Sequence, residues 1–559
     1  MAPKFKPENI DYSLYLVTGR ELLPPGKDYY ESLEESLRGG VTVVQVREKN
    51  IDSGEFYEIA RKTKLLTDAY NVPLIINDRL DICLSVGAAG LHIGQTDLDP
   101  RTARNLLPPG SVLGLSIGSL EEASRLLDLY KDEETGGPLK LVDYVGIGAV
   151  WRTTSKDVSK KVMLGPEGVG KILDLLHDGS GGSIKSVAIG GIHLPNLPHL
   201  LHGSRSPIHL RTLDGIAVIS DIVSSPHPEE AARQLSEAFK RGVAEPSLSE
   251  GRGGHAVLPT GIHRADRQGD GGRRRSKIDW LEGVVGLMKV VKEKKPLAHQ
   301  MTNTVVANDS ANATLALGGS PIMATHPLDV KDLSKILDAL LINFGTISDK
   351  QGMIVAGQEA NKNLKPIIFD PVAIGATSYR RETAKELLDA WQPTVIKGNA
   401  GEIGALAGSL EVASKGVDSV GPGFANPADV VKTLARQKRA IVAMTGVDDY
   451  ISDGETVLKV SNGHHWMGCI TGSGCMTGTA VTVYCGAARI AGTSSTQLVK
   501  GDMLLGVLAG ILVYTIAGQK AGERDDVRGP GTFRAAFIDE MYHVTTEDVL
   551  WMAKFEIVE

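Results

Sequence analysis

The chain has 559 residues, of which 42% are hydrophobic and 23% are charged. These proportions are typical of a soluble globular protein, and the length is sufficient for two to four domains. The formal net charge of −7 argues against a nucleic-acid binder, because such proteins usually present a basic surface. It does not exclude anionic small molecules, since a pocket can be locally basic on an acidic protein.

The cysteine and hydropathy patterns indicate a protein of a reducing compartment. Cys83, Cys469, Cys475 and Cys485 form no Cys-x-x-Cys pair, so we expect thiols rather than disulfides, and a cytoplasmic protein. The most apolar stretch, Met503–Gly518, has sixteen residues that include three glycines, whereas a membrane span needs about 20 apolar residues. We therefore expect a buried helix there and no contact with a membrane.

Residues 1–241 contain eight short β-type runs separated by segments with helical periodicity. The runs are Tyr15–Thr18, Val41–Val46, Leu74–Ile76, Gly90–Ile93, Val112–Ile117, Tyr144–Val150, Ser186–Ile189 and Gly215–Ile219. Eight alternating β and α units in about 250 residues predict a TIM (β/α)8 barrel. In that fold the functional groups lie where strands end, so the polar residues after each run are the candidates for a site.

Polar residues follow the second, third and fourth runs. Gln45, Arg47 and Lys49 share one face of an extended segment and bring an amide and two cations together; the simpler alternative is a solvent-facing strand end. Asp78 and Asp97 lie at adjacent strand ends and offer oxygen ligands for Mg²⁺ that bridges a pyrophosphate. Taken singly, either aspartate is more simply explained as a cap or turn residue.

The last three runs are followed by groups suited to phosphate. The segment Trp151–Lys156 contains three hydroxyls and two cations that could clasp a phosphate chain. The seventh run leads into Gly190-Gly191 and the eighth into Ser220, and these two loops form the usual phosphate cradle of the fold. Two separate anion sites predict an enzyme that joins two phosphorylated molecules.

Seven motif groups within residues 12–240 resemble the thiamin-phosphate synthase family. They are YLVTG, QVREK, IINDR, GLHIGQTDL, YVGIGAV with TTSK, AIGGI and GIAVIS, in the order of the family. The resemblance implies that hydroxymethylpyrimidine diphosphate is coupled to thiazole phosphate with release of pyrophosphate. It also implies a dissociative mechanism, in which diphosphate departs with Mg²⁺ and lysine assistance before the thiazole nitrogen captures the pyrimidine cation.

The resemblance also implies roles for individual residues. Asp78 and Asp97 would bind Mg²⁺, and Lys156 would take part in catalysis. The residues expected around the pyrimidine diphosphate are Gln45, Arg47, Lys49, Asn77, Ser116 and Lys156. The residues expected near the thiazole phosphate are Thr153, Ser155, Gly191, Val218, Ile219 and Ser220.

The composition changes abruptly between residues 242 and 276. This stretch contains eight glycines and six arginines and has neither helical nor strand periodicity. Such a segment cannot bury enough apolar surface to offset the entropy of ordering it. We expect a flexible linker, rather than a nucleic-acid or localisation patch, between two domains.

Residues 277–559 have longer helical patterns that alternate with apolar runs. The runs include Ala339–Phe344, Pro366–Phe369, Thr394–Ile396 and Ala440–Met444. This alternation predicts an α/β layered domain with ligands at the carboxyl ends of its strands. Asp370 and Glu402 supply carboxylates that could hold Mg²⁺ together with the phosphates of ATP.

A glycine-rich segment, Ile470–Gly478, precedes a long apolar helical pattern. Free N–H groups at Gly472, Ser473, Gly474 and Cys475 could form an anion hole for a transferring phosphoryl group. The simpler alternatives are close packing at the glycines and a Cys475 that is buried as a small apolar side chain.

Motifs across residues 280–545 resemble hydroxyethylthiazole kinases. They are TNTVVANDSANATLALGGSPIM, INFGT, FDPVAIGAT, KGNAGEI, MTGVDDYISDG, NGHHWMGCITGSGCMTGTA and GPGTFRAAFIDEMY. The resemblance implies a ribokinase-like fold, phosphorylation of the thiazole alcohol by MgATP, and a homo-oligomer built on a trimer of this domain.

The kinase resemblance assigns residues by position. Asp370 and Glu402 would bind Mg²⁺, and Asn303, Lys397 and Thr445 would contact ATP, with Lys397 in a place where many bacterial relatives have arginine. Met323 and Gly472 would line the thiazole pocket. Cys475 would be catalytic, in the place of the aspartate base of the wider fold.

The two halves predict consecutive reactions, because the product of the kinase is the acceptor of the synthase. We therefore expect a bifunctional enzyme that acts on small molecules. Two alternatives remain for the barrel: a thiazole tautomerase, or a non-catalytic scaffold or thiamin sensor. The residues that would hold a diphosphate and Mg²⁺ weigh against the tautomerase.

Overall fold

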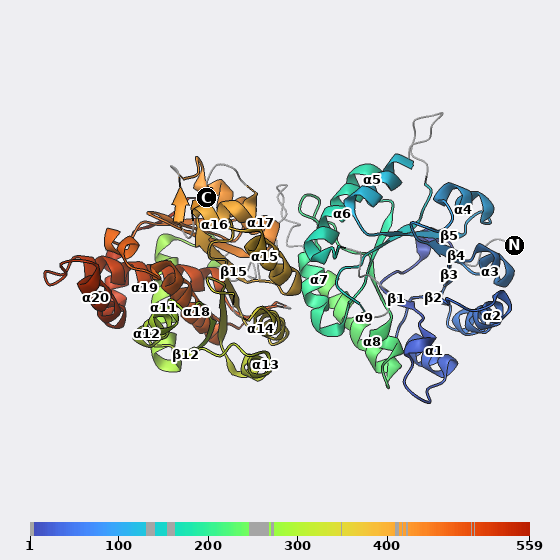
Figure 1. Ribbon diagram of the computed structural model, residues 1–559, viewed down its shortest axis with the longest axis horizontal. Helices are drawn as coiled ribbons and strands as arrows, with labels where there is room; N and C mark the ends of the chain where they lie inside the picture. The colour runs from blue at the N-terminus through green and yellow to red at the C-terminus, as the bar shows by residue number, and fades with distance from the viewer. Residues whose placement is uncertain are drawn as a thin grey trace. The chain divides into compact units, whose positions relative to one another are not determined.

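The computed structural model describes residues 5–129, 140–153, 162–244, 268–269, 273–347, 349–408, 413–415, 418–420, 423–493, 495–496 and 498–558. The chain forms two compact units, Met1–Pro246 and Ser247–Glu559 (Figure 1). Each unit has its own hydrophobic core and is described by itself.

The N-terminal unit is the predicted TIM barrel. Its eight strands are all parallel and pair in sequence order, and the last strand pairs with the first to close the barrel. The strands are β1 (Leu14–Val17), β2 (Val43–Val46), β3 (Leu74–Asn77), β4 (Gly90–Ile93), β5 (Val112–Ile117), β6 (Tyr144–Ile147), β7 (Lys185–Ile189) and β8 (Gly215–Val218). Each of the eight predicted runs overlaps one of these strands.

Helices surround the strands of this barrel (Figure 1). They are α1 (Tyr29–Arg38), α2 (Ser53–Ala69), α3 (Leu80–Val86), α4 (Pro100–Leu106), α5 (Leu120–Leu129), α6 (Gly165–Ser180), α7 (Leu197–Gly203), α8 (Ser220–Val223) and α9 (Pro228–Ala244). Short 3₁₀ turns lie at Pro7–Asn9, Arg20–Leu22 and Leu194–Asn196. Helix α9 continues three residues beyond position 241, where the sequence predicts the end of the domain.

Alternation along the strands separates two buried layers. Leu14 and Leu16 belong to the core between the strands and the helices, whereas Tyr15 and Val17 belong to a second cluster inside the barrel. Successive side chains of a strand point to opposite faces, so each strand contributes to both layers. The inner layer forms the floor of the cavity described below.

A glycine inside the barrel makes room for an aromatic ring. A Cβ atom built on Gly114 of β5 would overlap the ring of Tyr144 on the neighbouring strand β6. The ring is fully packed, with the Tyr144 side chain 1% exposed. A residue without a side chain is therefore needed at this position.

Gly114→Ala is expected to lower the free energy of unfolding of the barrel by about 1–3 kcal/mol, the usual cost of overpacking a core. Gly54→Ala is the matched control, because Gly54 lies in the first turn of α2 with open space around it and alanine has the higher helix propensity. Urea denaturation of both variants checks this. Equal stabilities of Gly114→Ala and the wild type would contradict it.

The C-terminal unit is an α/β domain built on a nine-stranded mixed sheet. The strand order is β12-β11-β13-β14-β15-β18-β19-β20-β21, parallel as far as β18 and antiparallel beyond it. The strands are β11 (Leu297–Met301), β12 (Ser320–Ile322), β13 (Ala339–Asn343), β14 (Ile367–Asp370), β15 (Val395–Asn399), β18 (Ile441–Thr445), β19 (Asp449–Ser452), β20 (Val457–Val460) and β21 (Phe555–Ile557). Two further pairs of short strands are β9 (Gln268–Gly269) with β10 (Arg273–Arg274), and β16 (Ala413–Lys415) with β17 (Asp418–Val420).

Helices cover both faces of this sheet. The helices are α11 (Lys277–Lys294), α12 (Ala307–Ala316), α13 (Pro327–Ile336), α14 (Lys350–Lys362), α15 (Ser378–Ala390), α16 (Ala400–Ala407), α17 (Pro427–Lys438), α18 (Ser473–Ala491), α19 (Met503–Gly522), α20 (Pro530–His543) and α21 (Thr546–Met552). Leu341 of β13 packs in one cluster with residues of α11, α18 and α19. Its neighbours Leu340 and Ile342 pack with residues of α13, α14 and α15. The result is three layers, helix–sheet–helix.

Helix α19 contains the apolar stretch singled out in the sequence. Among the described residues it is the one helix that is long and apolar enough to cross a membrane, but 83% of its most apolar window is buried inside the structure. It packs between α18 and α20, as the interpretation of a buried domain helix predicts.

Candidate active sites

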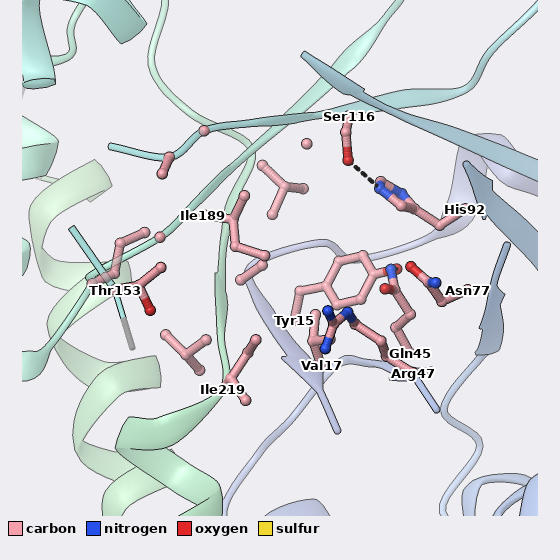
Figure 2. Close-up of a pocket in the computed structure, with 18 of the residues that line it drawn as sticks. Tyr15, Val17, Gln45, Arg47, Asn77, His92, Ser116, Thr153, Ile189 and Ile219 are labelled. Carbon is pink, nitrogen blue, oxygen red and sulfur yellow. Dashed lines mark hydrogen bonds between the residues drawn. The ribbon is translucent and has the colours of Figure 1, made fainter. Parts of the chain in front are cut away.

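A cavity at the mouth of the barrel gathers residues from all eight strands or the loops that follow them. The predicted site residues that line it are Gln45, Arg47, Asn77, Ser116, Thr153, Gly191, Val218, Ile219 and Ser220. Figure 2 shows Gln45, Arg47 and Asn77 on one side of this space and Thr153 on another. Residues 175 positions apart in the chain, such as Gln45 and Ser220, thus share one site.

The two aspartates predicted to bind metal lie beside the cavity rather than in its lining. Asp78 directly follows β3 in the left-handed conformation, with φ 65°, and its N–H donates to the carbonyl of His92 at 2.8 Å. Oδ2 of Asp97 accepts the N–H of Gly94 at 2.7 Å. Burial raises the pKa of Asp78, and the negative charge of Asp97 raises it further.

Two close carboxylates of this kind suit a divalent cation that also binds substrate oxygens. No cluster of three or more histidine, cysteine, aspartate or glutamate side chains suited to a metal occurs in the part of the chain that the structure describes. The pair of carboxylates, with few protein ligands, fits an ion that a diphosphate would also coordinate. Lys49, three residues after the end of β2, lies outside the cavity lining, and the predicted Ser155 and Lys156 lie outside the described residues.

The loops after β7 and β8 contribute Gly190, Gly191 and Ser220 to the cavity lining. Gly190 and Gly191 follow β7 with φ of 104° and 66°, a conformation that favours glycine. The side chain of Asn196 donates to the carbonyl of Gly191 at 2.8 Å and so fixes the turn. Nδ1 of His193 lies 2.7 Å from Oδ1 of Asp221 and connects this loop to α8, the helix that begins at Ser220.

Asp221→Asn is expected to bring the pKa of His193 back towards its usual value, because the hydrogen bond that the imidazole donates to the Asp221 carboxylate raises that pKa. Because this pKa is raised in the folded state, the interaction of His193 with Asp221 stabilises the fold fully below about pH 6.5. The stabilisation is lost as the pH rises through the raised pKa. NMR titration of the His193 imidazole measures the shift.

Asp178→Asn is the matched control for this titration. Asp178 pairs with His209 at 2.6 Å on the same barrel, so its loss should leave the titration of His193 unchanged. A His193 titration midpoint in Asp221→Asn that equals that of the wild type would contradict the prediction.

Three polar residues of the cavity lining, all with ring side chains, were not predicted from the sequence. Tyr15, His92 and Tyr144 line the cavity and are hydrogen-bonded to one another and to Gln45 and Ser116. They lie within predicted strands, where aromatic residues are most simply read as core. The alternation of side chains along a strand could have indicated their position. Tyr15 and Val17 face the barrel interior, whereas Leu14 and Leu16, which alternate with them, face the helices.

The second unit has a buried charged site at the carboxyl ends of its strands. Nζ of Lys397, on β15, lies 3.3 Å from Oδ1 of Asp370, on β14, and the two residues are 3% and 0% exposed. Nδ2 of Asn343 donates to Oδ2 of Asp370 at 2.7 Å, and Nδ2 of Asn303 donates to Oδ1 of Asn343 at 3.0 Å. Burial raises the pKa of Asp370, while the charge of Lys397 opposes that rise.

Two further acids lie in this region. The carboxylate of Glu402 accepts the backbone N–H groups of Ala373 and Asn399 at 2.9 and 2.8 Å. Burial, followed by the charge of Asp370, raises the pKa of Glu402 to about 7. Asp449, at the start of β19, is buried, and this burial raises its pKa to about 7. Neither Asn343 nor Asp449 was predicted from the sequence.

The glycine-rich segment lies next to the buried pair. Gly472 has φ 81° and caps α18, which begins at Ser473. A Cβ atom on Gly474 would lie 3.5 Å from Nζ of Lys397, and Nδ2 of Asn303 lies 3.5 Å from Sγ of Cys475. Burial, followed by the charge of Asp370, raises the pKa of Cys475, so this side chain is a thiol at neutral pH.

The remaining predicted residues lie at strand ends of the same sheet. Oγ1 of Thr445, the last residue of β18, donates to the carbonyl of Gly398 at 3.4 Å. Met323 directly follows β12, the edge strand, and is half-buried.

Comparison with known proteins assigns both units. The model of the family described as "Thiamine monophosphate synthase" matches residues 14–222, and that of the "Hydroxyethylthiazole kinase family" matches residues 288–547. The "Probable thiamine biosynthetic bifunctional enzyme" of Schizosaccharomyces pombe is 35% identical over 550 residues, which cover 97% of this chain and 96% of that protein. The chain belongs to the family of thiamine biosynthetic bifunctional enzymes.

Other relatives agree with this assignment. The "Thiamine biosynthetic bifunctional enzyme" of Saccharomyces cerevisiae is 33% identical over 571 residues, which cover 97% of each chain. The "Hydroxyethylthiazole kinase" of a Thermoanaerobacter species is 39% identical over 273 residues, which cover 48% of this chain and 98% of that protein. The predicted pair of folds, a TIM barrel and a ribokinase-like α/β domain, is confirmed, and the two units are called the synthase unit and the kinase unit below.

Lys397→Met in the kinase unit is expected to lower the free energy of unfolding by about 3–5 kcal/mol, because it leaves the carboxyl of Asp370 buried without a cation. Protonation of Asp370 removes the unpaired charge, so the loss should shrink at acidic pH. Urea denaturation at neutral and acidic pH measures both effects.

Lys335→Met serves as the control for this substitution. Lys335 pairs with Asp332 on the surface at 2.7 Å, and exposed pairs contribute little. An equal change in the free energy of unfolding in Lys397→Met and Lys335→Met would show that the buried pair is not important for stability.

Proposed function

We propose that this protein makes thiamin phosphate in two consecutive steps. The kinase unit phosphorylates 4-methyl-5-(2-hydroxyethyl)thiazole with MgATP. The synthase unit then condenses the thiazole phosphate with hydroxymethylpyrimidine diphosphate and releases pyrophosphate. The observation that carries the proposal is that one chain matches the two family models in succession, each over a unit with its own site at the carboxyl ends of parallel strands.

In the synthase unit the two ends of the cavity suit two different anions. Asp78 and Asp97 would hold Mg²⁺, which neutralises charge on the departing diphosphate. The groups that would bind the pyrimidine diphosphate are Gln45, Arg47, Lys49, Asn77 and Ser116, with Lys156 as the assisting cation. The thiazole phosphate would be held by Thr153, Ser155, Gly191, Val218, Ile219 and Ser220, at the loops after β7 and β8.

In the kinase unit phosphoryl transfer would take place beside the buried pair of Asp370 and Lys397. Asp370 and Glu402 would hold Mg²⁺ with ATP, and Asn303, Lys397 and Thr445 would contact the nucleotide. The N–H groups of Gly472, Ser473, Gly474 and Cys475 at the start of α18 would receive the transferring phosphoryl group, with Met323 and Gly472 beside the thiazole. Because the pKa of Cys475 is raised, catalysis would depend mainly on positioning and on the anion hole.

The proposed organisation is a synthase unit of residues 1–241, a linker of residues 242–276 and a kinase unit of residues 277–559. A flexible tether of 35 residues would span on the order of 30–35 Å and raise the local concentration of the intermediate. Small molecules are the proposed partners. We also propose a cytoplasmic homo-oligomer built on a kinase-unit trimer.

Two single substitutions should separate the activities. Asp370→Asn is expected to lower formation of thiamin phosphate from the thiazole alcohol about a hundredfold or more, and supplied thiazole phosphate should restore it. Asp78→Asn is expected to lower synthesis by a similar factor from either thiazole, while ATP is still consumed with the alcohol. The assay measures ADP and thiamin phosphate in parallel.

Asp332→Asn is the control, since Asp332 lies on the surface of the kinase unit. Thiamin phosphate that forms from thiazole phosphate in the wild type, but not from the alcohol and ATP, would refute the kinase assignment. A wild type that forms none even from thiazole phosphate would refute the synthase assignment.

A further inference from the structure

Five side chains form a continuous chain of hydrogen bonds across the interior of the synthase barrel. Nε2 of Gln45 lies 2.8 Å from Oη of Tyr15, and Oη of Tyr15 lies 2.7 Å from Oη of Tyr144. Oη of Tyr144 lies 2.9 Å from Nδ1 of His92, and Nε2 of His92 lies 2.9 Å from Oγ of Ser116. Figure 2 shows the last of these bonds at the wall of the cavity. These residues are called the interior chain below.

Burial fixes the number of protons in the interior chain. Tyr15 and Tyr144 are each 1% exposed. Burial raises the pKa of both phenols well above the usual value, so each keeps its single proton at neutral pH. Each phenol can donate one hydrogen bond and can accept more than one. Because a buried donor without a partner is costly, each phenol proton is donated to a neighbour in the chain, and the bonds then run in one direction.

The direction follows from the end at Gln45. Its amide N–H donates to Tyr15, so Tyr15 donates to Tyr144 and Tyr144 donates to Nδ1 of His92. His92 then carries its proton on Nε2 and donates to Oγ of Ser116. The hydroxyl proton of Ser116 is left to point into the cavity, while the carbonyl oxygen of Gln45 remains an acceptor.

If the direction of the hydrogen bonds in the interior chain were reversed, the donor and acceptor roles of Gln45 and Ser116 would change together. If the amide of Gln45 turned over, its oxygen would accept from Tyr15, and every later bond would reverse until Ser116 donated to His92. Ser116 would then have no proton to offer the cavity. The two ends, which both line the cavity, thus have hydrogen-bonding characters that depend on each other.

We propose that Tyr15, Tyr144 and His92 are positioning residues of the synthase reaction, which order the protons of the interior chain so that Ser116 donates to an acceptor atom of the bound pyrimidine diphosphate. The acceptor class is a ring nitrogen or a diphosphate oxygen. This inference rests on the synthase activity proposed above. It gives a role to three cavity residues that act on the bound substrate through Ser116.

Tyr144→Phe tests the proposal because it removes the central link and keeps the ring. We expect kcat of thiamin phosphate synthesis to fall about tenfold, the value of one oriented hydrogen bond, with KM for thiazole phosphate within about twofold of the wild type. Tyr12→Phe is the matched control. The Tyr12 ring packs against that of Tyr144 with centroids 4.9 Å apart, but its buried hydroxyl has no hydrogen-bond partner among the described residues.

A double variant shows whether Tyr144 acts through Ser116. In a Ser116→Ala background, Tyr144→Phe should change kcat less than about twofold, because residues that act as one unit are not additive. Effects that multiply in the double variant would overturn the proposal, as would a Tyr144→Phe variant that behaves like Tyr12→Phe.

The tautomer of His92 can be observed independently of activity. In ¹⁵N spectra of the full chain labelled at histidine, with His92 assigned by its loss in His92→Gln, we expect the proton on Nε2 in the wild type and a weakened preference in Tyr144→Phe. A proton on Nδ1 in the wild type would overturn the proposal. A wild type with the expected tautomer that forms no thiamin phosphate would refute the synthase activity and the positioning role with it.

Discussion

Parallel β-strands joined by helical crossovers are the constraint on which both active sites depend. Each crossover returns the chain to the same edge, so the carboxyl ends of all parallel strands meet there. In the synthase unit this brings Gln45, Ser116 and Ser220 into one cavity. In the kinase unit it brings Asp370 and Lys397, from neighbouring parallel strands, to within 3.3 Å.

The two sites provide partners for their buried polar groups in different ways. The synthase cavity has a neutral interior chain in which every phenol has both a donor and an acceptor partner. The kinase site buries a full charge pair with two asparagines in support. A half-satisfied network would be more costly than an apolar core, so in each site the supporting residues matter as much as those that would touch substrate.

The presence of both units in one chain suits the chemistry proposed for them. The kinase product is the acceptor of the synthase, so a fusion keeps the two enzymes at equal amounts and the intermediate near its next site. A tether of this length changes local concentration without any new contact. The two reactions remain separable by single substitutions, because the residues proposed for each lie within one unit.

The sequence by itself determined which strands and helices form and which charged residues follow them. Period-two runs and helical periodicity are local signals, and they predicted all eight barrel strands and the layered kinase unit. Asp370 and Lys397 were also found, because they directly follow or end such runs. The position of α19 inside the domain was predicted from its length and its glycines.

Only the tertiary structure decided how these residues face one another. Tyr15 and Tyr144 are separated by 129 positions, yet their hydroxyls lie 2.7 Å apart. The alternation along each strand indicates that both face the barrel interior, but it does not show that they meet. Asp78 and Asp97 lie beside the cavity rather than in its lining, and the left-handed conformation of Asp78 was not predicted from the sequence. Barrel closure between β1 and β8 is the physical reason, since it fixes which inward side chains meet and no local pattern records it.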